Sequence, residues 1–206
     1  MHPNPMFRHT PEAHARALAE ARGFGVVSSA SGGQVLLAHI PFLLEGDRIE
    51  AHLVRSNPIA RALAEGPRAA TLVVSGPDGY VSPDWYAEPD LVPTWNYVAV
   101  HLAGRLSLAD PDSLLAHLER LSAKFEAGLA PKHPWTHHKM TEGVMARMMR
   151  QILPVEMVVE RVESTFKLNQ NRSASARAGA AGQLAEGHTP GQETGALAAL
   201  MRGVDG

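Results

Sequence analysis

Residues 80–106 read YVSPDWYAEPDLVPTWNYVAVHLAGRL, and they hold two of the three tryptophans and all three tyrosines of the chain. The second half of this stretch alternates with the period of two that is typical of a β-strand. Three prolines in the first half predict an irregular or edge segment, since proline cannot donate a hydrogen bond to a neighbouring strand. We therefore expect a loop and then a long strand, with Trp95, Tyr97, Ala99, His101 and Ala103 on one face and Asn96, Val98, Val100, Leu102 and Gly104 on the other.

The aromatic residues of this stretch allow two interpretations. Rings with amide and hydroxyl groups nearby, placed on a loop, suit a flat and partly polar ligand. The same rings could instead cap the core of a barrel. Both interpretations stay open on the chemistry of the stretch alone.

Length and charge bound the class of protein. A chain of 206 residues with 45% hydrophobic content can bury a full core, as one large domain or as one domain with an appendage. Its 19 basic side chains are outnumbered by 21 acidic ones. Non-specific nucleic-acid binding needs a basic surface, so we expect no direct contact with DNA or RNA.

Cysteine usage and hydropathy indicate a compartment. The chain has no cysteine, which excludes disulfides and cysteine-ligated zinc and agrees with a reducing compartment. The first residues, MHPNPMFRH, lack the apolar core of a signal peptide, and no later run approaches the roughly 18 apolar residues of a membrane span. These features predict a cytoplasmic protein without membrane contact.

The remaining chain predicts a meander of strands with helices between them. Turn residues separate short β-type runs, and proline and glycine mark the ends of the helical patterns. A meander at this spacing favours a mainly β barrel or sandwich with peripheral helices. Further strands are predicted at 24–30, 35–44, 48–54, 68–75 and 155–166, with a turn at 76–79, and helices at 11–22, 58–65, 111–127 and 141–153.

Two helices and the tail carry apolar stripes. In the helix after Asp110 the expected buried face is Leu114, Leu115, Leu118, Leu121 and Phe125. In the helix from Thr141 it is Val144, Met145, Met148, Met149 and Ile152, and methionines at this spacing predict core packing. We expect one domain over residues 1–172 and an alanine- and glycine-rich helical appendage over 173–206, anchored by Leu184, Leu197, Leu200 and Met201.

The junction after the strand 48–54 concentrates polar chemistry. Asn57 is a good N-cap and Pro58 a good first residue for the short helix that follows. Arg55 contributes a cation and Ser56 a hydroxyl beside the free N–H groups of the helix. The junction is therefore a candidate phosphate site, although many capped helices bind no anion.

The histidines suggest no defined metal site. His133, His137 and His138 share a loop with Trp135, but no carboxylate stands nearby at ligand spacing, so we interpret the loop as solvated and responsive to pH. His39, His52 and His101 lie in strands, where they could be satisfied locally or could face a ligand. The chain has no nucleophile elbow, Walker loop or dinucleotide fingerprint, so hydrolase and nucleotide-triphosphatase activities have no support.

Several segments together resemble the PaiB family, the FMN-binding negative transcriptional regulators. They are VSPDWY, VPTWNYVAVHLAGRL and FKLNQNR, with AHIPF at 38–42 and HLVRSNP at 52–58. The resemblance runs from about residue 5 to 172 in the same order and spacing, although Asn169 stands where the family pattern leads us to expect serine. It implies an FMN-binding split barrel that forms a homodimer with flavin sites at the subunit interface.

The resemblance also implies site residues. Arg55, Ser56 and Asn57 would hold the FMN phosphate, at the same junction that the N-cap and its neighbouring cation indicate. The segments around His39 and His52 would lie along the isoalloxazine ring and ribityl chain. The residues that would close the site, in part from the second subunit, are Trp95, Asn96, Tyr97, Lys167, Gln170 and Asn171.

Two function classes follow from the resemblance. The chain would be a negative transcriptional regulator that uses flavin as a sensor or structural ligand. Alternatively it would be a flavin-dependent oxidoreductase or flavin reductase that takes electrons from a nicotinamide nucleotide, because a flavin barrel can serve either purpose. A flavin-storage module and a haem-handling relative of the same barrel are further alternatives, and whether the protein is an enzyme stays open.

Overall fold

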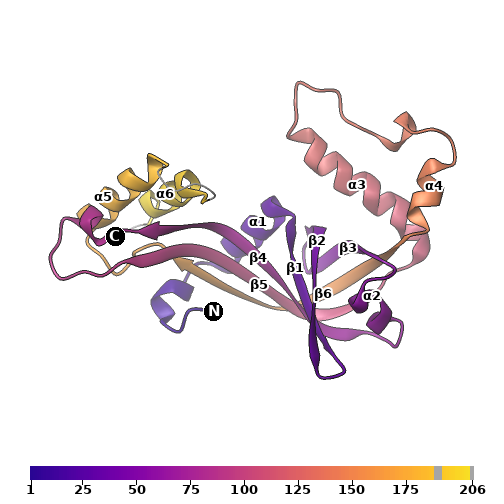
Figure 1. Ribbon diagram of the computed structural model, residues 1–206, viewed down its shortest axis with the longest axis horizontal. Coiled ribbons are helices and arrows are strands. Elements are labelled where there is room, and N and C mark those ends of the chain that lie inside the picture. Colours follow the sequence, from indigo (N-terminus) through magenta and orange to yellow (C-terminus); the bar gives the residue numbers. More distant parts are fainter. Residues whose placement is uncertain (188–191, 205–206) are drawn as a thin grey trace. The chain divides into compact units, whose positions relative to one another are not determined.

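A closed six-stranded barrel dominates the computed structural model, which describes residues 1–187 and 192–204 (Figure 1). The strand order is β1-β2-β3-β6-β5-β4, so the predicted mainly β barrel with peripheral helices is confirmed. The strands are β1 (Phe24–Ser31), β2 (Gln34–Glu45), β3 (Arg48–Val54), β4 (Arg68–Val81), β5 (Thr94–Leu108) and β6 (Ile152–Lys167). The helices are α1 (Glu12–Arg22), α2 (Pro58–Leu63), α3 (Leu114–Ala127), α4 (Val144–Met149), α5 (Ala174–Ala185) and α6 (Thr194–Arg202), with short 3-10 turns at Pro5–Arg8, Pro83–Tyr86, Pro111–Ser113 and His137–Lys139.

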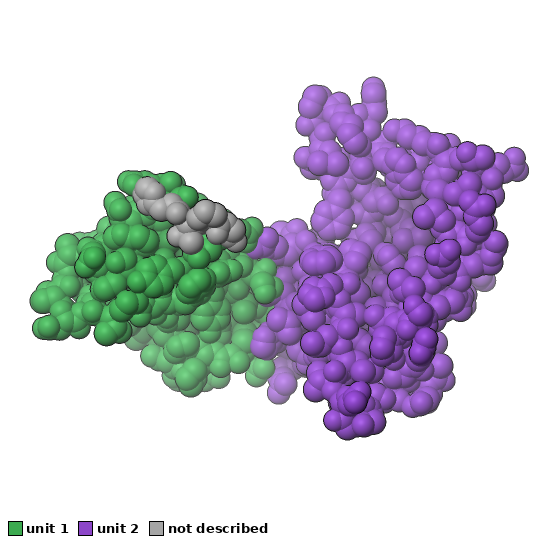
Figure 2. All heavy atoms as spheres, viewed as in Figure 1, with its two compact units in different colours: residues 1–18, 75–100, 163–206 green, residues 19–74, 101–162 purple. Residues whose placement is uncertain are grey.

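The chain divides into two compact units (Figure 2). Unit 1 contains residues 1–18, 75–100 and the chain from 163 onward, and unit 2 contains residues 19–74 and 101–162. The long strands β4, β5 and β6 contribute residues to both units. Among the residues that the structure describes, no helix has the length and apolar character needed to cross a membrane.

Unit 2 holds the paired barrel strands. β1 and β2 form the predicted hairpin through Gly32 and Gly33, whose φ angles of 57° and 77° favour glycine. β1 also pairs with β4, β2 with β3 and β3 with β6, all antiparallel. Alternate side chains therefore point into the barrel, where the apolar core includes Val27, Ile40, Phe42, Ile49, Leu53, Leu72, Leu102, Val155 and Met157.

Unit 1 contains the helical tail. α5 and α6 lie side by side, and three of the four predicted anchors, Leu184, Leu197 and Met201, are buried. A Cβ added to Gly179 would come within 2.7 Å of the Trp85 carbonyl oxygen, so α5 packs closely against the 3-10 turn Pro83–Tyr86. The tail therefore packs as two helices within unit 1, as its apolar residues indicated.

The predicted turn at residues 76–79 is wrong, because β4 continues through this Gly-Pro-Asp-Gly sequence to Val81. The pairing of β4 with β1 spans Ala70 to Val73, so Pro77 lies beyond it and costs no hydrogen bond to that strand. A Cβ at Gly76 would lie 2.8 Å from the Cβ of Val98. These residues therefore permit close packing of β4 on β5 and do not reverse the chain.

The core face predicted for the helix from Thr141 is also wrong. α4 is only six residues long, none of them is buried, and Met148 is 54% exposed. Its methionines line an open cavity that is described below. In α3, Leu114 and Leu121 are buried as expected, but His117 joins them while Leu115 and Phe125 are exposed.

Candidate functional site

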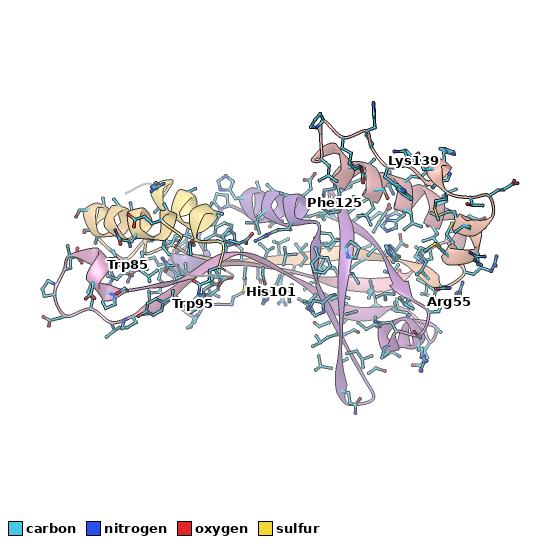
Figure 3. All side chains as sticks on the ribbon, turned by 45° about the horizontal axis from the view of Figure 1, so that its top comes forward. Arg55, Trp85, Trp95, His101, Phe125 and Lys139 are labelled. Atoms are coloured by element: carbon cyan, nitrogen blue, oxygen red, sulfur yellow. The ribbon has the colours of Figure 1, made fainter. Side chains whose placement is uncertain are left out.

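The strand-to-helix junction of unit 2 is built as the sequence predicts. β3 ends at Val54, and the Asn57 side chain caps α2 by accepting a hydrogen bond from the Ile59 N–H at 2.9 Å. Arg55, labelled in Figure 3, is exposed. Its Nε donates to the Arg150 carbonyl oxygen at 2.7 Å. Since this bond fixes the base of the guanidinium, Arg55 presents its charge at the surface beside the exposed Ser56 hydroxyl.

The two predicted site histidines occupy different environments in unit 2. His39 is exposed on β2 and stacks on Phe24 of β1, with ring centroids 6.4 Å apart. His52 is half-buried on β3, and its Nδ1 lies 3.1 Å from Nε2 of His117 in α3. The exposed ring of His39 can therefore contact a ligand or a partner, whereas Nδ1 of His52 already shares a hydrogen bond with His117.

His117 is a buried titratable residue that the sequence reasoning missed. Its side chain is 2% exposed, and its Nδ1 lies 3.8 Å from Glu50 Oε2, beyond hydrogen-bonding distance. Burial, the neighbouring His52 and the Arg120 guanidinium lower the pKa of His117 to about 4. Glu50 does not offset them because its carboxylate pairs with Arg120. The i, i+3, i+7 spacing of Leu114, His117 and Leu121 was the signal that could have placed it in the buried stripe.

Trp95 lies on the exposed face of β5 in unit 1, as the alternation predicted. The Trp95 side chain, labelled in Figure 3, is 45% exposed. Its Nε1 donates to Asp78 Oδ1 at 2.9 Å, and its ring meets that of Tyr80 edge to face. Tyr97, two residues further, is half-buried on the same face. These rings form a fixed aromatic surface, so the ligand-facing interpretation keeps its physical basis.

Asn96 points to the opposite face and is fully buried. Its Nδ2 contacts the Met201 sulfur at 3.5 Å, and its Oδ1 has no hydrogen-bond partner among the residues that the structure describes. A buried amide oxygen without a partner costs free energy. Contact between Asn96 and a ligand on the aromatic face would therefore have to use its backbone.

Lys167 is joined to the aromatic surface of unit 1. Its Nζ donates to the Trp95 carbonyl oxygen at 2.6 Å and to Thr94 Oγ1. Burial, with a smaller contribution from Arg172, lowers the pKa of Lys167. The ammonium group is therefore tied to the backbone of Trp95, a contact across 72 positions that local sequence spacing could not have revealed.

The residues after Lys167 form a tight turn. Gln170 folds back, accepting from the Leu168 N–H at 2.8 Å and donating to the Phe166 carbonyl oxygen, while Asn171 is exposed. Asn169 has a φ of 62° and donates through Nδ2 to the Tyr86 hydroxyl at 2.9 Å. Asparagine tolerates this left-handed conformation, so its presence in place of serine has a structural reason.

A cavity of about 580 Å³ lies in unit 2 between α3, α4 and the loop that joins them. The residues that line it are mainly apolar, and they include Val54, the residue before Arg55. The sequence pattern does not indicate this cavity, because methionines at helical spacing predict core packing. The other apolar lining residues include Leu118, Trp135, Met140, Met145, Met148, Met149 and Ile152.

Each unit, taken by itself, offers donor groups that match one part of FMN. A phosphate dianion is matched by an exposed guanidinium and hydroxyl at Arg55 and Ser56. An isoalloxazine ring is matched by an exposed aromatic face and a nearby N–H donor at Trp95 and Lys167. The first pair belongs to unit 2 and the second to unit 1.

Comparison with known proteins agrees with this chemistry. Residues 1–161 match the family described as "Putative FMN-binding domain". The protease synthase and sporulation protein PAI 2 of Bacillus subtilis is 30% identical over 161 residues, covering 75% of this chain and 74% of that protein. An uncharacterized protein of Emericella nidulans is 25% identical over 180 residues, covering 69% and 72%.

Solved structures share the fold. The flavocytochrome Anf3 from Azotobacter vinelandii superposes with a TM-score of 0.59 at 17% identity, covering 81% of this chain and 72% of that one. The FAD and heme binding protein from Mycobacterium smegmatis gives a TM-score of 0.56 at 19% identity, with 78% and 73% covered. The barrel is therefore of the flavin split-barrel type, and the family match assigns a flavin as its cofactor.

Proposed function

We propose, from the premise that this chain belongs to the PaiB family of FMN-binding proteins, that it is a flavoprotein acting as a negative regulator of transcription. In this proposal FMN is the sensor or structural ligand. The net charge of −2 argues against direct DNA contact, so regulation would act through another protein. When bound, FMN would supply redox chemistry, and the chain's own residues would bind and orient it.

One observation carries the flavin proposal at this chain's own residues. β3 ends in an exposed Arg55 whose Nε is fixed by the Arg150 carbonyl oxygen, next to Ser56 and the capped start of α2. We assign the FMN phosphate to Arg55, Ser56 and Asn57. The segments around His39 and His52 are assigned to the isoalloxazine ring and ribityl chain. The residues assigned to close the site, in part from the second subunit, are Trp95, Asn96, Tyr97, Lys167, Gln170 and Asn171.

A homodimer is part of the proposal. Phe24, Val35, Leu37 and His39 share the outer face of the β1–β2 hairpin, because paired residues of antiparallel strands point the same way. The first three are 54%, 72% and 62% exposed. A second copy covering this apolar face would also cover His39, which agrees with a flavin site at the subunit interface.

The dimer has a direct test. Leu37→Glu is expected to convert the wild-type dimer into a monomer in sedimentation velocity, whereas Leu129→Glu, a matched change of an exposed leucine in a loop, should leave a dimer. Wild-type protein that sediments as a monomer would refute the dimer without affecting the fold.

The cofactor is tested by comparing two flavins that differ by one phosphate. Quenching of flavin fluorescence is expected to give much tighter binding of FMN than of riboflavin, since only FMN engages a guanidinium and its neighbours. Equal affinities would show that no phosphate site contributes. If neither FMN nor riboflavin bound, the flavin would be removed from the proposed function, and the barrel fold would be unaffected.

One observation favours the alternative of a flavin-dependent oxidoreductase or flavin reductase. The cavity of about 580 Å³ next to Val54 is large enough to hold an organic substrate. Steady oxidation of NADH or NADPH under air by the FMN-loaded protein would support this alternative. Tight FMN binding without nicotinamide oxidation would support the regulatory proposal.

A further inference from the structure

The loop between α3 and α4 is tied to one face of α3. Glu119 and Glu126 stand seven residues apart, which is two helical turns, so both carboxylates face the same side. Glu126 accepts a hydrogen bond from the Trp135 N–H at 2.8 Å and forms an ion pair with Lys132. These contacts fix the start of the loop, and they hold the segment that follows beside Glu119.

Glu119 meets two histidines of this segment. Its Oε1 lies 3.1 Å from Nδ1 of His137, and the rings of His137 and His138 have centroids 4.0 Å apart. One ligand atom from each of the three residues lies within 4.8 Å of the other two. α3 thus supplies the carboxylate whose absence from the local sequence had argued against a metal site.

Two imidazoles and one carboxylate form a donor set for a divalent transition metal. Tetrahedral bonds of about 2.0 to 2.1 Å place ligand atoms roughly 3.3 Å apart. One contact already has this length, and the exposed side chains of His138 and Glu119 can supply the remaining movement through their rotamers. The geometry points to a binding site for one zinc-like divalent ion at Glu119, His137 and His138.

The position of this metal site gives it a chemical setting. Glu119, His137 and His138 all line the apolar cavity of about 580 Å³. Three protein ligands leave a coordination position for water or another donor, as in catalytic metal sites. The ion would therefore bind, through that position, a ligand with one coordinating group and an apolar body. This inference does not depend on the flavin proposal, because no assigned flavin residue is a metal ligand.

Zinc titration of the tag-free, chelator-treated full chain tests the site. Calorimetry in the absence of FMN is expected to give one zinc ion per chain, and cobalt(II) should show the absorption of a low-symmetry site with nitrogen and oxygen donors. Glu119→Gln replaces an anionic ligand by a neutral amide and His138→Ala removes a ligand, so each should weaken zinc binding on the order of 100-fold, the upper end of the range for changes one shell further out. His133→Ala is the matched control from the same loop and should bind as the wild type does.

Three outcomes would overturn the inference. The wild type could bind no zinc, the two ligand variants could bind it unchanged, or His133→Ala could weaken it as much as they do. Circular dichroism of each variant verifies that the fold is retained, and Glu119→Asp provides a second variant that keeps the charge while shortening the reach. FMN titration of the same samples reports separately on the flavin site.

Discussion

His52 and His117 meet edge to face, with Nδ1 of His52 3.1 Å from Nε2 of His117. The contact joins β3 to α3 across 65 positions of sequence. One ring must donate the shared proton and the other must accept it, so the pair is intact only while the accepting ring is neutral. Burial lowers the pKa of both residues, which favours this state.

Acid is expected to destabilise the protein through His117. Its pKa falls from 6.5 to about 4 on folding, so the unfolded chain takes up the proton first as the pH drops. The contribution of neutral His117 is therefore fully present above pH 6.5 and is lost between pH 6.5 and 4, by at most about 3 kcal/mol. Urea denaturation at a series of pH values measures this loss.

His117→Leu should flatten that pH profile, because leucine fills the buried site without titrating. His133→Leu, a substitution in the exposed loop, serves as the control. A profile for His117→Leu as steep as that of the wild type would assign the acid sensitivity to other groups.

Arg55→Ala should weaken FMN binding about tenfold or more while changing riboflavin binding little, since the guanidinium is assigned to the phosphate. Fluorescence titration with both flavins measures the ratio of the two affinities. Arg147→Ala removes the same charge from exposed α4 and should preserve the ratio. An unchanged ratio in Arg55→Ala would place the phosphate elsewhere.

Lys167→Met should weaken the binding of FMN and riboflavin to the same extent, about tenfold. The substitution keeps an unbranched apolar chain, one atom shorter, but removes the hydrogen bonds to Trp95 and Thr94 that hold the aromatic surface. Titration with both flavins again measures the effect, and Lys139→Met is the control. Selective loss of FMN would instead assign Lys167 to the phosphate.

Gly104→Ala should destabilise the barrel by at least about 3 kcal/mol, because the new Cβ would lie 1.9 Å from the Val158 carbonyl oxygen. Gly182→Ala meets no atom within 4 Å in the interior of α5 and should be neutral or stabilising by up to about 1 kcal/mol. Thermal unfolding of both variants makes the comparison. Similar transition temperatures would contradict the close approach of β5 and β6.

The sequence determined the features that depend on neighbouring residues. The alternation of β5, the Gly32–Gly33 hairpin and the Asn57 cap follow from strand period, turn conformation and a side-chain hydrogen bond two residues away. The combined motifs also identified the family and its cofactor, since their order and spacing extend over most of the chain.

Which distant residues meet is apparent from the tertiary structure alone, and it was not predictable from the sequence pattern. The folded arrangement brings several such residues together. It placed His117 against His52, brought Glu119 to His137, and set the methionines of α4 around a cavity in place of a core. It also carried β4 through a sequence that forms turns elsewhere, because close packing against Val98 favours glycine there. Such contacts depend on how whole strands and helices pack, which local propensity and periodicity do not encode.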